Sequence, residues 1–160
     1  MDVREDLLRM LRRGRVDEFN EVSARRQHII DLSNAELSEA RIEGADFRGI
    51  TLDGVKLQRA RLGGCDFRGA SLRFSNLEAA DLEGADFTKA NLYSAYLVRA
   101  RMAGATIHGA DICAAVFPDD VQPEEIRLSQ EKGTRLRHDP TVALLRQIQE
   151  LLGRGAGPRG

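Results

Sequence analysis

Carboxylate and guanidinium side chains recur in this sequence at a fixed interval. Asp46, Asp66 and Asp86 lie twenty residues apart, and Arg48 and Arg68 are separated by the same spacing. Three carboxylates gathered in one column could bind a cation or imitate the phosphates of DNA. Two arginines in a column would form a small basic strip, which we expect to be solvated. The elements that position these side chains decide between a binding site and a solvated surface.

Side chains that carry out catalysis are scattered. His28, His108 and His138 lie far apart in the sequence, and Cys65 and Cys113 suggest neither a thiolate pair nor a metal cage. The sequence has no P-loop, no dinucleotide fingerprint and no HExxH motif. We therefore predict a protein that is not an enzyme and that has no cofactor, no metal site and no catalytic residue.

The overall composition is that of one ordinary domain. The 160 residues include 24 basic and 25 acidic side chains, so the formal charge is −1. This balance gives no reason to expect direct binding to nucleic acid or to an anionic membrane. No apolar run approaches the roughly 18 residues of a membrane span, and the charged N-terminal segment does not resemble a secretory signal. We expect a soluble cytoplasmic protein.

A five-residue repeat organises the middle of the chain. From Asp31 to Asp120 the sequence divides into eighteen blocks, beginning DLSNA, ELSEA, RIEGA and DFRGI. The second place of each block is always Leu, Ile, Met or Phe, and the last place is nearly always small. A helix or a strand would spread these apolar residues over several faces. The period therefore requires a chain that turns by a fixed angle every five residues.

A second period of twenty residues sets that angle. Phe47, Phe67 and Phe87 lie twenty residues apart, and Ile107 continues the series. Four blocks then make one coil, each block turns the chain by about 90°, and eighteen blocks make 4.5 coils. At roughly 4.8 Å between stacked strands, the solenoid is about 20 Å tall. The second-place residue and the small residue point inward, and a narrow core of this kind suits a sequence without tryptophan.

The blocks resemble a known consensus. ADFRG, ADLEG, ADFTK and ANLYS are close to the A(D/N)Lxx repeat of the pentapeptide-repeat protein family, and the resemblance covers residues 31 to about 118. It implies an all-β solenoid, namely a right-handed quadrilateral β-helix, in which the aspartate tends to serve the turn. Some members of this family resemble duplex DNA, bind DNA gyrase or topoisomerase IV, and protect against quinolones or related poisons.

Both ends of a solenoid expose core and unpaired edges, so they need caps. We expect a helical cap at 1–28, with helices over 2–13 and 16–26, followed by the β-helix at 29–118. We expect a C-terminal helical cap or dimerisation segment at 119–153, with a short helix over 123–130. A disordered tail at 154–160 completes the predicted organisation. Asp139-Pro140 predicts the start of a last amphipathic helix. Its candidate capping or dimer residues are Leu144, Leu145, Ile148, Leu151 and Leu152.

Apolar side chains also occupy outward places in the upper coils. They fall on two neighbouring faces and form a candidate patch for a partner or for helix docking: Phe74, Tyr93, Tyr96, Val98 and Val116. Such a patch is typical of an interface. We favour coverage by the chain's own last helix. A homodimer contact and a different protein partner are the alternatives.

Two functions follow from these features. The leading hypothesis is a non-catalytic scaffold that binds a protein partner of unknown identity. The alternative, which the family resemblance implies, is a DNA mimic that binds DNA gyrase or topoisomerase IV and protects against topoisomerase poisons. Residues 31–120 carry 14 acidic and 10 basic side chains, a net charge of −4, which is low for a phosphate mimic. Arg41, Arg61 and Arg101 also recur on the face next to the aspartates, where we expect them to neutralise the acidic column. The Arg-rich composition suggests a bacterial source.

Overall fold

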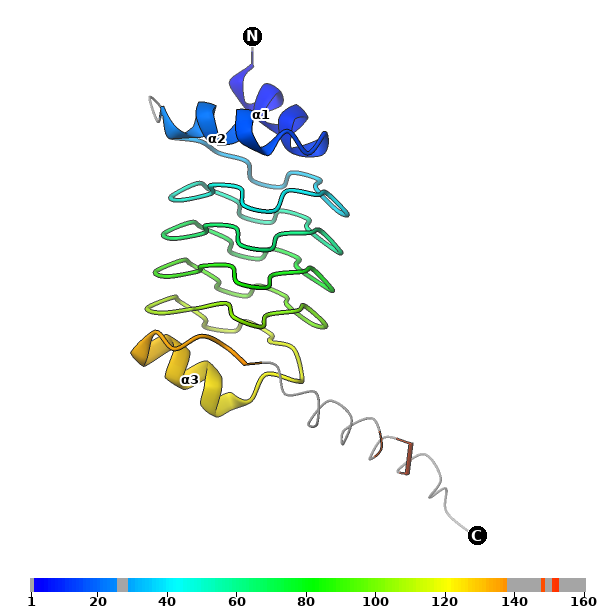
Figure 1. The fold of residues 1–160 in the computed structure, drawn as a ribbon, viewed down its shortest axis with the longest axis vertical. Helices are drawn as coiled ribbons and strands as arrows, with labels where there is room; N and C mark the ends of the chain where they lie inside the picture. Colours follow the sequence, from blue (N-terminus) through cyan, green and yellow to red (C-terminus); the bar gives the residue numbers. More distant parts are fainter. Residues whose placement is uncertain (1, 26–28, 138–147, 149–150, 153–160) are drawn as a thin grey trace.

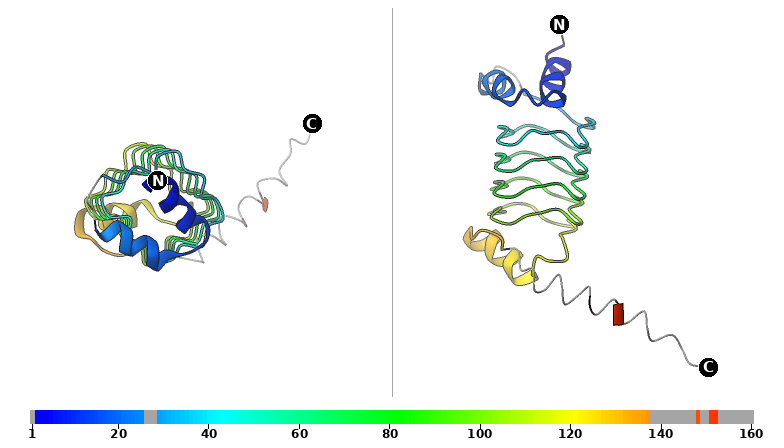
Figure 2. Two further views of the ribbon diagram at one scale, coloured as in Figure 1. Left: turned by 90° about the horizontal axis from the view of Figure 1, so that it is seen from above. Right: turned by 45° about the vertical axis from the view of Figure 1, so that its right-hand side comes forward.

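The chain forms a stack of coils with helices at its two ends (Figure 1). The computed structural model describes residues 2–25, 29–137, 148 and 151–152. Helices α1 (Val3–Arg12) and α2 (Val16–Ala24) precede the stack, and α3 (Pro123–Lys132) follows it. Figure 2 shows α1 and α2 at one end and α3 at the other. Within the described residues, no helix is long and apolar enough to cross a bilayer.

Parallel bridges hold the coils in register. They join residues twenty apart, from Asp31 with Thr51 to Tyr96 with Val116, and one bridging residue occurs in every block of five. Each coil therefore has four sides, and the predicted twenty-residue register is confirmed. In the described part of the chain each side contributes single bridges and no longer strand, because the chain turns again within the block.

The four sides can be numbered by their blocks. Side I holds the blocks that begin at residues 31, 51, 71, 91 and 111, and sides II, III and IV follow in steps of five residues. Viewed along the stack, the coils superpose (Figure 2). A side chain at a given place in one block therefore lies above the corresponding side chain of the coil before it.

A tight turn in each of the first seventeen blocks produces the corner. In the first block the N–H of Ala35 donates to the carbonyl oxygen of Leu32 at 3.2 Å, and the residue between them in the fourth place, Asn34, has φ 58°. A positive φ at that place is the mark of a type II turn. The N–H of Leu32 donates to Thr51 O of the next coil at 2.8 Å. Some main-chain groups of the block therefore form the turn, and others pair with the neighbouring coil.

The second-place and last-place side chains fill the core. Leu82 and Ala85, for example, have no exposed surface. The rings of Phe47, Phe67 and Phe87 stack with centroids 5.1 and 4.8 Å apart and nearly parallel planes. The predicted division into inward and outward places is confirmed.

Helices α1 and α2 extend this core over the first coil. Leu7, Leu8, Leu11 and Phe19 are buried in the same apolar cluster as the coils, and the Phe19 ring lies 5.3 Å from that of Phe47. The apolar face of α1 differs by a small rotation from the expected one. Helical spacing in the sequence predicts an inward face of Val3, Leu7, Met10 and Leu11. In the structure Leu8 is buried, whereas Val3 is 56% exposed.

The last coil is covered over two of its sides. On side IV, Ser129 Oγ accepts a hydrogen bond from Ile107 N at 3.1 Å, and the Gln130 side chain donates to Ala110 O at 3.1 Å. On side III, Leu136 donates to Ala105 O at 2.7 Å and is 2% exposed. Helix α3 ends two residues later than the predicted Gln130, because Gly133 at φ 71° supplies the left-handed cap.

Candidate functional site

Exposed aromatic rings gather on sides I and II near the C-terminal end of the stack. Phe74 and Tyr93 meet edge to face, with centroids 5.5 Å apart. The Arg73 guanidinium lies 5.5 Å from the Phe74 centroid and 5.9 Å from that of Tyr93. Tyr96 is bridged to Val116 on the next coil, as the twenty-residue register predicted. We call Phe74, Tyr93, Tyr96, Val98 and Val116 the aromatic patch.

Most of the aromatic patch is open in the described structure. Phe74 is 58% exposed, Tyr96 40%, Val116 45% and Tyr93 36%, while Val98 is partly buried. Tyrosine and arginine are among the residues that contribute most to binding energy in protein interfaces. The cluster of two rings and one guanidinium is therefore suited to protein recognition. Arg73 was not among the predicted patch residues, although it precedes Phe74 and also lies in an outward place.

Phe74 occupies a backbone conformation that disfavours it. Its φ is 57°, in the left-handed region, where a residue with a Cβ costs roughly 1–2 kcal/mol relative to the right-handed conformation. Bulky residues are rare there, and glycine is the residue that adopts this conformation at low cost. Phe74 also leaves more than half of its surface in water. Eight other described residues with a side chain share this positive φ, so the conformation belongs to the turn of the repeat. The feature that the fold does not explain is a large, exposed aromatic ring at such a position.

Left-handed residues with side chains concentrate on the two sides that carry the patch. On sides III and IV, seven of the eight left-handed fourth-place residues are glycine, Lys89 being the exception. On sides I and II only Gly54 is glycine among nine such residues. Because the backbone conformation is the same on all four sides, the difference lies in which sides retain side chains at this place. Sides I and II are therefore the more specialised surface.

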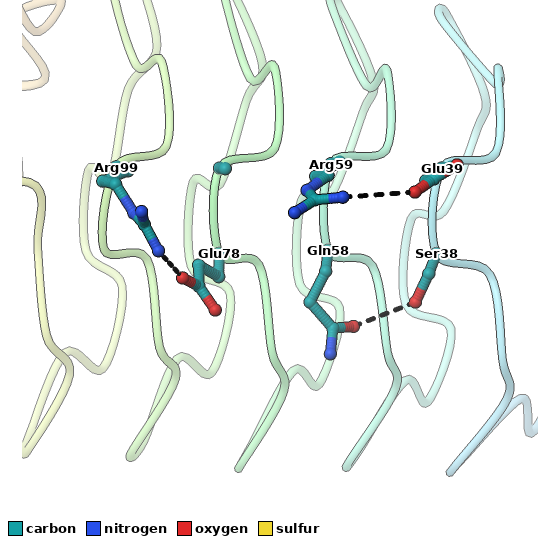
Figure 3. Close-up of a pocket in the computed structure, with 7 residues that line it drawn as sticks. Ser38, Glu39, Gln58, Arg59, Glu78 and Arg99 are labelled. Atoms are coloured by element: carbon teal, nitrogen blue, oxygen red, sulfur yellow. Dashed lines mark hydrogen bonds and ion pairs between the residues drawn. The ribbon is translucent and has the colours of Figure 1, made fainter.

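A shallow polar groove runs along side II beside the patch. Its volume is about 260 Å³, and its lining residues are Ser38, Glu39, Gln58, Arg59, Glu78, Ala79 and Arg99. Arg59 pairs with Glu39 at 3.5 Å, and Arg99 pairs with Glu78 (Figure 3). Opposite charges are thus matched along the groove. The sequence analysis did not predict this groove. The pattern that could have indicated it is the lack of glycine in the fourth place of the blocks on side II.

The aspartate column of side IV is a ladder of ion pairs. Arg48 contacts Asp46 at 2.5 Å and Asp66 at 3.4 Å, and Arg68 contacts Asp66 at 2.6 Å and Asp86 at 3.9 Å. Each aspartate also accepts a hydrogen bond from a main-chain N–H two residues later, as Asp66 does from Arg68. These carboxylates therefore serve turns and pair with arginines.

The charge of the ladder shows in the pKa of its central carboxyl group. Partial burial of Asp66 acts to raise that pKa, but hydrogen bonds from Arg68 and the charges of Arg68 and Arg48 hold it below its ordinary value. The neutralising arginines differ from the expected ones. Arg61 pairs with Glu43, and Arg101 pairs with Asp81 and Glu83, all on side III. Arg48 and Arg68 are closer to the aspartates, because they share their blocks.

The two thiols lie in different surroundings. Burial raises the pKa of Cys65 to about 12, and its thiol donates to Ile42 O at 3.1 Å. Cys113 is exposed on side I of the last coil. Among the residues that the structure describes, no three His, Cys, Asp or Glu side chains could hold a metal ion together. Nothing in this part of the chain shows a catalytic arrangement.

The predicted last helix falls mostly outside the described residues. Leu144 and Leu145 lie outside them, as does the tail at 154–160. Ile148 is 42% exposed, and Leu151 and Leu152 are each 71% exposed. The docking of this segment on the aromatic patch, or on a second chain, stays a prediction.

The repeat itself decides the family. The family model for pentapeptide repeats matches eight copies, over residues 30–69, 52–88, 65–102 and 80–117. The chain belongs to the pentapeptide-repeat family. No curated protein has a sequence similar enough to match it.

Two solved structures of cyanobacterial pentapeptide-repeat proteins share this fold. HetL of the cyanobacterium Nostoc, a pentapeptide-repeat protein involved in heterocyst differentiation regulation, is 31% identical with a TM-score of 0.55, and the match covers 56% of this chain and 41% of HetL. A second Nostoc pentapeptide-repeat protein is 29% identical with a TM-score of 0.59, over 71% of this chain and 90% of its own. Full-length QnrB1, a plasmid-mediated fluoroquinolone resistance protein, is 25% identical over 75% of this chain and 72% of its own, with a TM-score of only 0.29.

Proposed function

We propose that this pentapeptide-repeat chain is a non-catalytic interaction module that binds a protein partner through the aromatic patch. In this proposal the repeat is a right-handed quadrilateral β-helix of about 4.5 coils, closed by helical caps at 1–28 and 119–153. The rigid stack then presents side chains at fixed spacings without a loop to order on binding. Low ordering cost is one way in which a scaffold improves affinity.

One observation carries the proposal, namely the conformation and exposure of Phe74. A phenylalanine that is 58% exposed at φ 57° is unfavourable for the isolated fold on both counts. Its ring contacts Tyr93 and the Arg73 guanidinium, so the neighbouring residues position it on the surface. Burial of the ring gives a reason for this arrangement. The proposal assigns that burial to a partner, and coverage by the chain's own last helix is the alternative that the pull-down tests.

A pull-down with a matched pair of variants tests the proposal. The full chain is used as bait in a lysate of the native host, beside Phe74→Gly and Lys89→Gly. Both substitutions remove an exposed side chain at a left-handed position, one on the patch and one on side IV. We expect Phe74→Gly to lose a captured protein that the wild type and Lys89→Gly retain. Equal capture by all three baits would refute the assignment of the patch.

A type II topoisomerase is the alternative partner. It requires a surface that imitates the phosphates of duplex DNA. The ladder of Arg48 and Arg68 with the aspartates of side IV weighs against that surface, because each of the three carboxylates lies within 4 Å of a guanidinium. Recovery of gyrase or topoisomerase IV subunits in the pull-down would nevertheless promote this alternative and call for a supercoiling assay.

The free cysteines bear on the compartment. Cys65 is buried, Cys113 is exposed, and both are free thiols. An exposed free thiol suits a reducing environment. The proposal therefore places the module in the cytoplasm, and the Arg-rich composition is the reason for proposing a bacterial source.

A further inference from the structure

In the part of the chain that the structure describes, the outer edge of the last coil is unpaired on side I. Within the described residues, the main-chain N–H groups of Ile112 and Ala114 have no acceptor. One coil earlier the equivalent groups are bonded: Leu92 N donates to Asp111 O at 2.7 Å, and Ser94 N donates to Cys113 O at 2.9 Å. The two donors therefore point along the stack toward the place of a next coil. Unpaired donors on a sheet edge are a template for an added strand.

The apolar surface of the core next to these donors is also incompletely covered. Its residues, Ile112, Ala115 and Phe117, are only partly buried, and we call them the floor of the last coil. The residues in the same places one coil earlier have no exposed surface, namely Leu92, Ala95 and Leu97. An occupant at this level would bury an aliphatic side chain as well as pair with the two donors.

On another side of the last coil, a segment of the chain itself already pairs with the corresponding edge. On side III of the same coil, Leu136 accepts from Gly104 N at 2.8 Å, donates to Ala105 O at 2.7 Å, and buries its side chain on the core. A non-helical segment with one inward aliphatic residue thus replaces the missing coil there. Sides I and II lack such a segment among the described residues, and they adjoin the aromatic patch at Val116.

We propose that this edge, defined as residues 111–117, receives an extended segment of the partner protein by strand addition. The segment pairs with the N–H groups of Ile112 and Ala114 and places an aliphatic side chain over the floor. Main-chain pairing supplies affinity in this mode of recognition, and the inward pocket supplies specificity. The inference rests on the proposed function, because the same partner then covers the patch.

A second copy of the chain fits the edge less well. Helix α3 stands over side IV of the last coil, so an end-to-end copy would bring an α3 helix toward the open floor. The outer residues of α3 are exposed and ion-paired, Arg127 with Glu124 and with Glu131. Burying those charges against Ile112 would cost more than the apolar contact returns.

The first test measures hydrogen exchange at the edge in the full chain, labelled with nitrogen-15 for NMR. The probe is a synthetic peptide with the sequence of residues 90–98, because residues 91–97 already pair with the residues of this edge from the preceding coil. The control peptide carries Leu92→Asp and Leu97→Asp. We expect the probe, at millimolar concentration, to slow exchange at Ile112 and Ala114 by about tenfold and the control to leave it unchanged.

Three outcomes would overturn the inference. The first is no change, or the same change with both peptides. The second is slow exchange at both amides in the absence of peptide. If this slow exchange persists on dilution but disappears when the chain is truncated after Arg137, the occupant of the edge is the chain's own tail. The third is slow exchange that disappears on dilution, which would identify a second copy.

A second test separates this inference from the proposed function. Ile112→Lys is added to the pull-down, with circular dichroism and the melting temperature as checks on folding. The inference predicts that Ile112→Lys loses the protein that Phe74→Gly also loses. Capture retained by a folded Ile112→Lys variant but lost by Phe74→Gly would refute strand addition and leave the patch assignment intact. Capture retained by both variants would refute both proposals. If Ile112→Lys fails to fold, the peptide measurement decides alone.

Discussion

The side-chain amide of Asn20 forms hydrogen bonds with the main chain of the first coil at the corner before Asp46, as a peptide group of a preceding coil would. Its Oδ1 accepts from Asp46 N at 2.8 Å, and its Nδ2 donates to Gly44 O at 3.1 Å. Main-chain groups of a solenoid end would otherwise face solvent or a second chain. One amide on α2 therefore satisfies two groups of the first coil, while the apolar residues of α1 and α2 cover its core.

Removal of this amide should destabilise the N-terminal cap. We expect Asn20→Ala to lower the free energy of unfolding by about 1–3 kcal/mol, because it leaves a donor and an acceptor of the first coil without partners. Urea denaturation measures the change. Glu21→Ala, at an exposed neighbouring position on the same helix, is the control, and we expect it to stay within about 0.5 kcal/mol. Equal losses in the two variants would contradict the assignment of Asn20.

The division into inward and outward places predicts a sharp contrast between neighbours in sequence. Leu82 has no exposed surface, whereas Glu83 is exposed and pairs with Arg101. We expect Leu82→Ala to cost about 2–5 kcal/mol and Glu83→Ala to cost at most about 1 kcal/mol. Thermal and urea unfolding of both variants provide the comparison. Similar costs at the two positions would argue against the coil assignment.

The ladder of side IV predicts an acid-dependent contribution to stability. A carboxyl group whose folded pKa lies below its unfolded value stabilises the fold above the unfolded pKa, and this contribution is lost as the pH falls through the folded pKa. Asp66 is such a group, with an ordinary value of 3.8. Arg68→Gln should therefore lower the melting temperature at about pH 7, and the difference from wild type should shrink at about pH 2. A difference that is the same at both pH values would show that the ladder is not its cause.

Two truncations separate the segment that pairs with the last coil from the residues after it. Deletion of residues 134–160 removes Leu136, which is 2% exposed and makes two main-chain hydrogen bonds to side III. Deletion of residues 138–160 retains it. We expect the longer deletion to cost about 2–4 kcal/mol more than the shorter one, measured by urea unfolding. Light scattering of the variant that lacks residues 138–160 also tests the homodimer. Equal stability of the two truncated chains would refute the capping role of Leu136.

Much of the fold could be predicted because one residue pattern repeats. The inward Leu, Phe and Ala columns follow from a period of five, and the stacking of Asp46, Asp66 and Asp86 follows from a period of twenty. Each block obeys the same local rule, so an error at one block is corrected by its neighbours. The ends do not repeat, and their details were harder to predict. The burial of Leu8 in place of Val3 depends on how α1 is rotated over the coil, which the sequence pattern leaves open by one position.

The candidate site was predictable in its members but not in its context. Tyr93 and Tyr96 could be placed outward by counting places in a block. Arg73 joins the patch because its guanidinium lies over two rings, and that contact depends on side-chain conformations. The N–H groups of Ile112 and Ala114 have no acceptor among the described residues, and this depends on where the chain goes after Pro118, which the repeat does not determine.

The central claim is that a protein partner contacts the aromatic patch, and site-specific photo-crosslinking in the native host tests it most directly. A photoreactive phenylalanine analogue is placed at position 74, and at positions 89 and 68 in separate strains as controls on side IV. The account predicts a discrete crosslinked protein from position 74 and none from positions 89 and 68. A crosslink from position 68 alone, above all to a topoisomerase subunit, or no crosslink from any position, would contradict it.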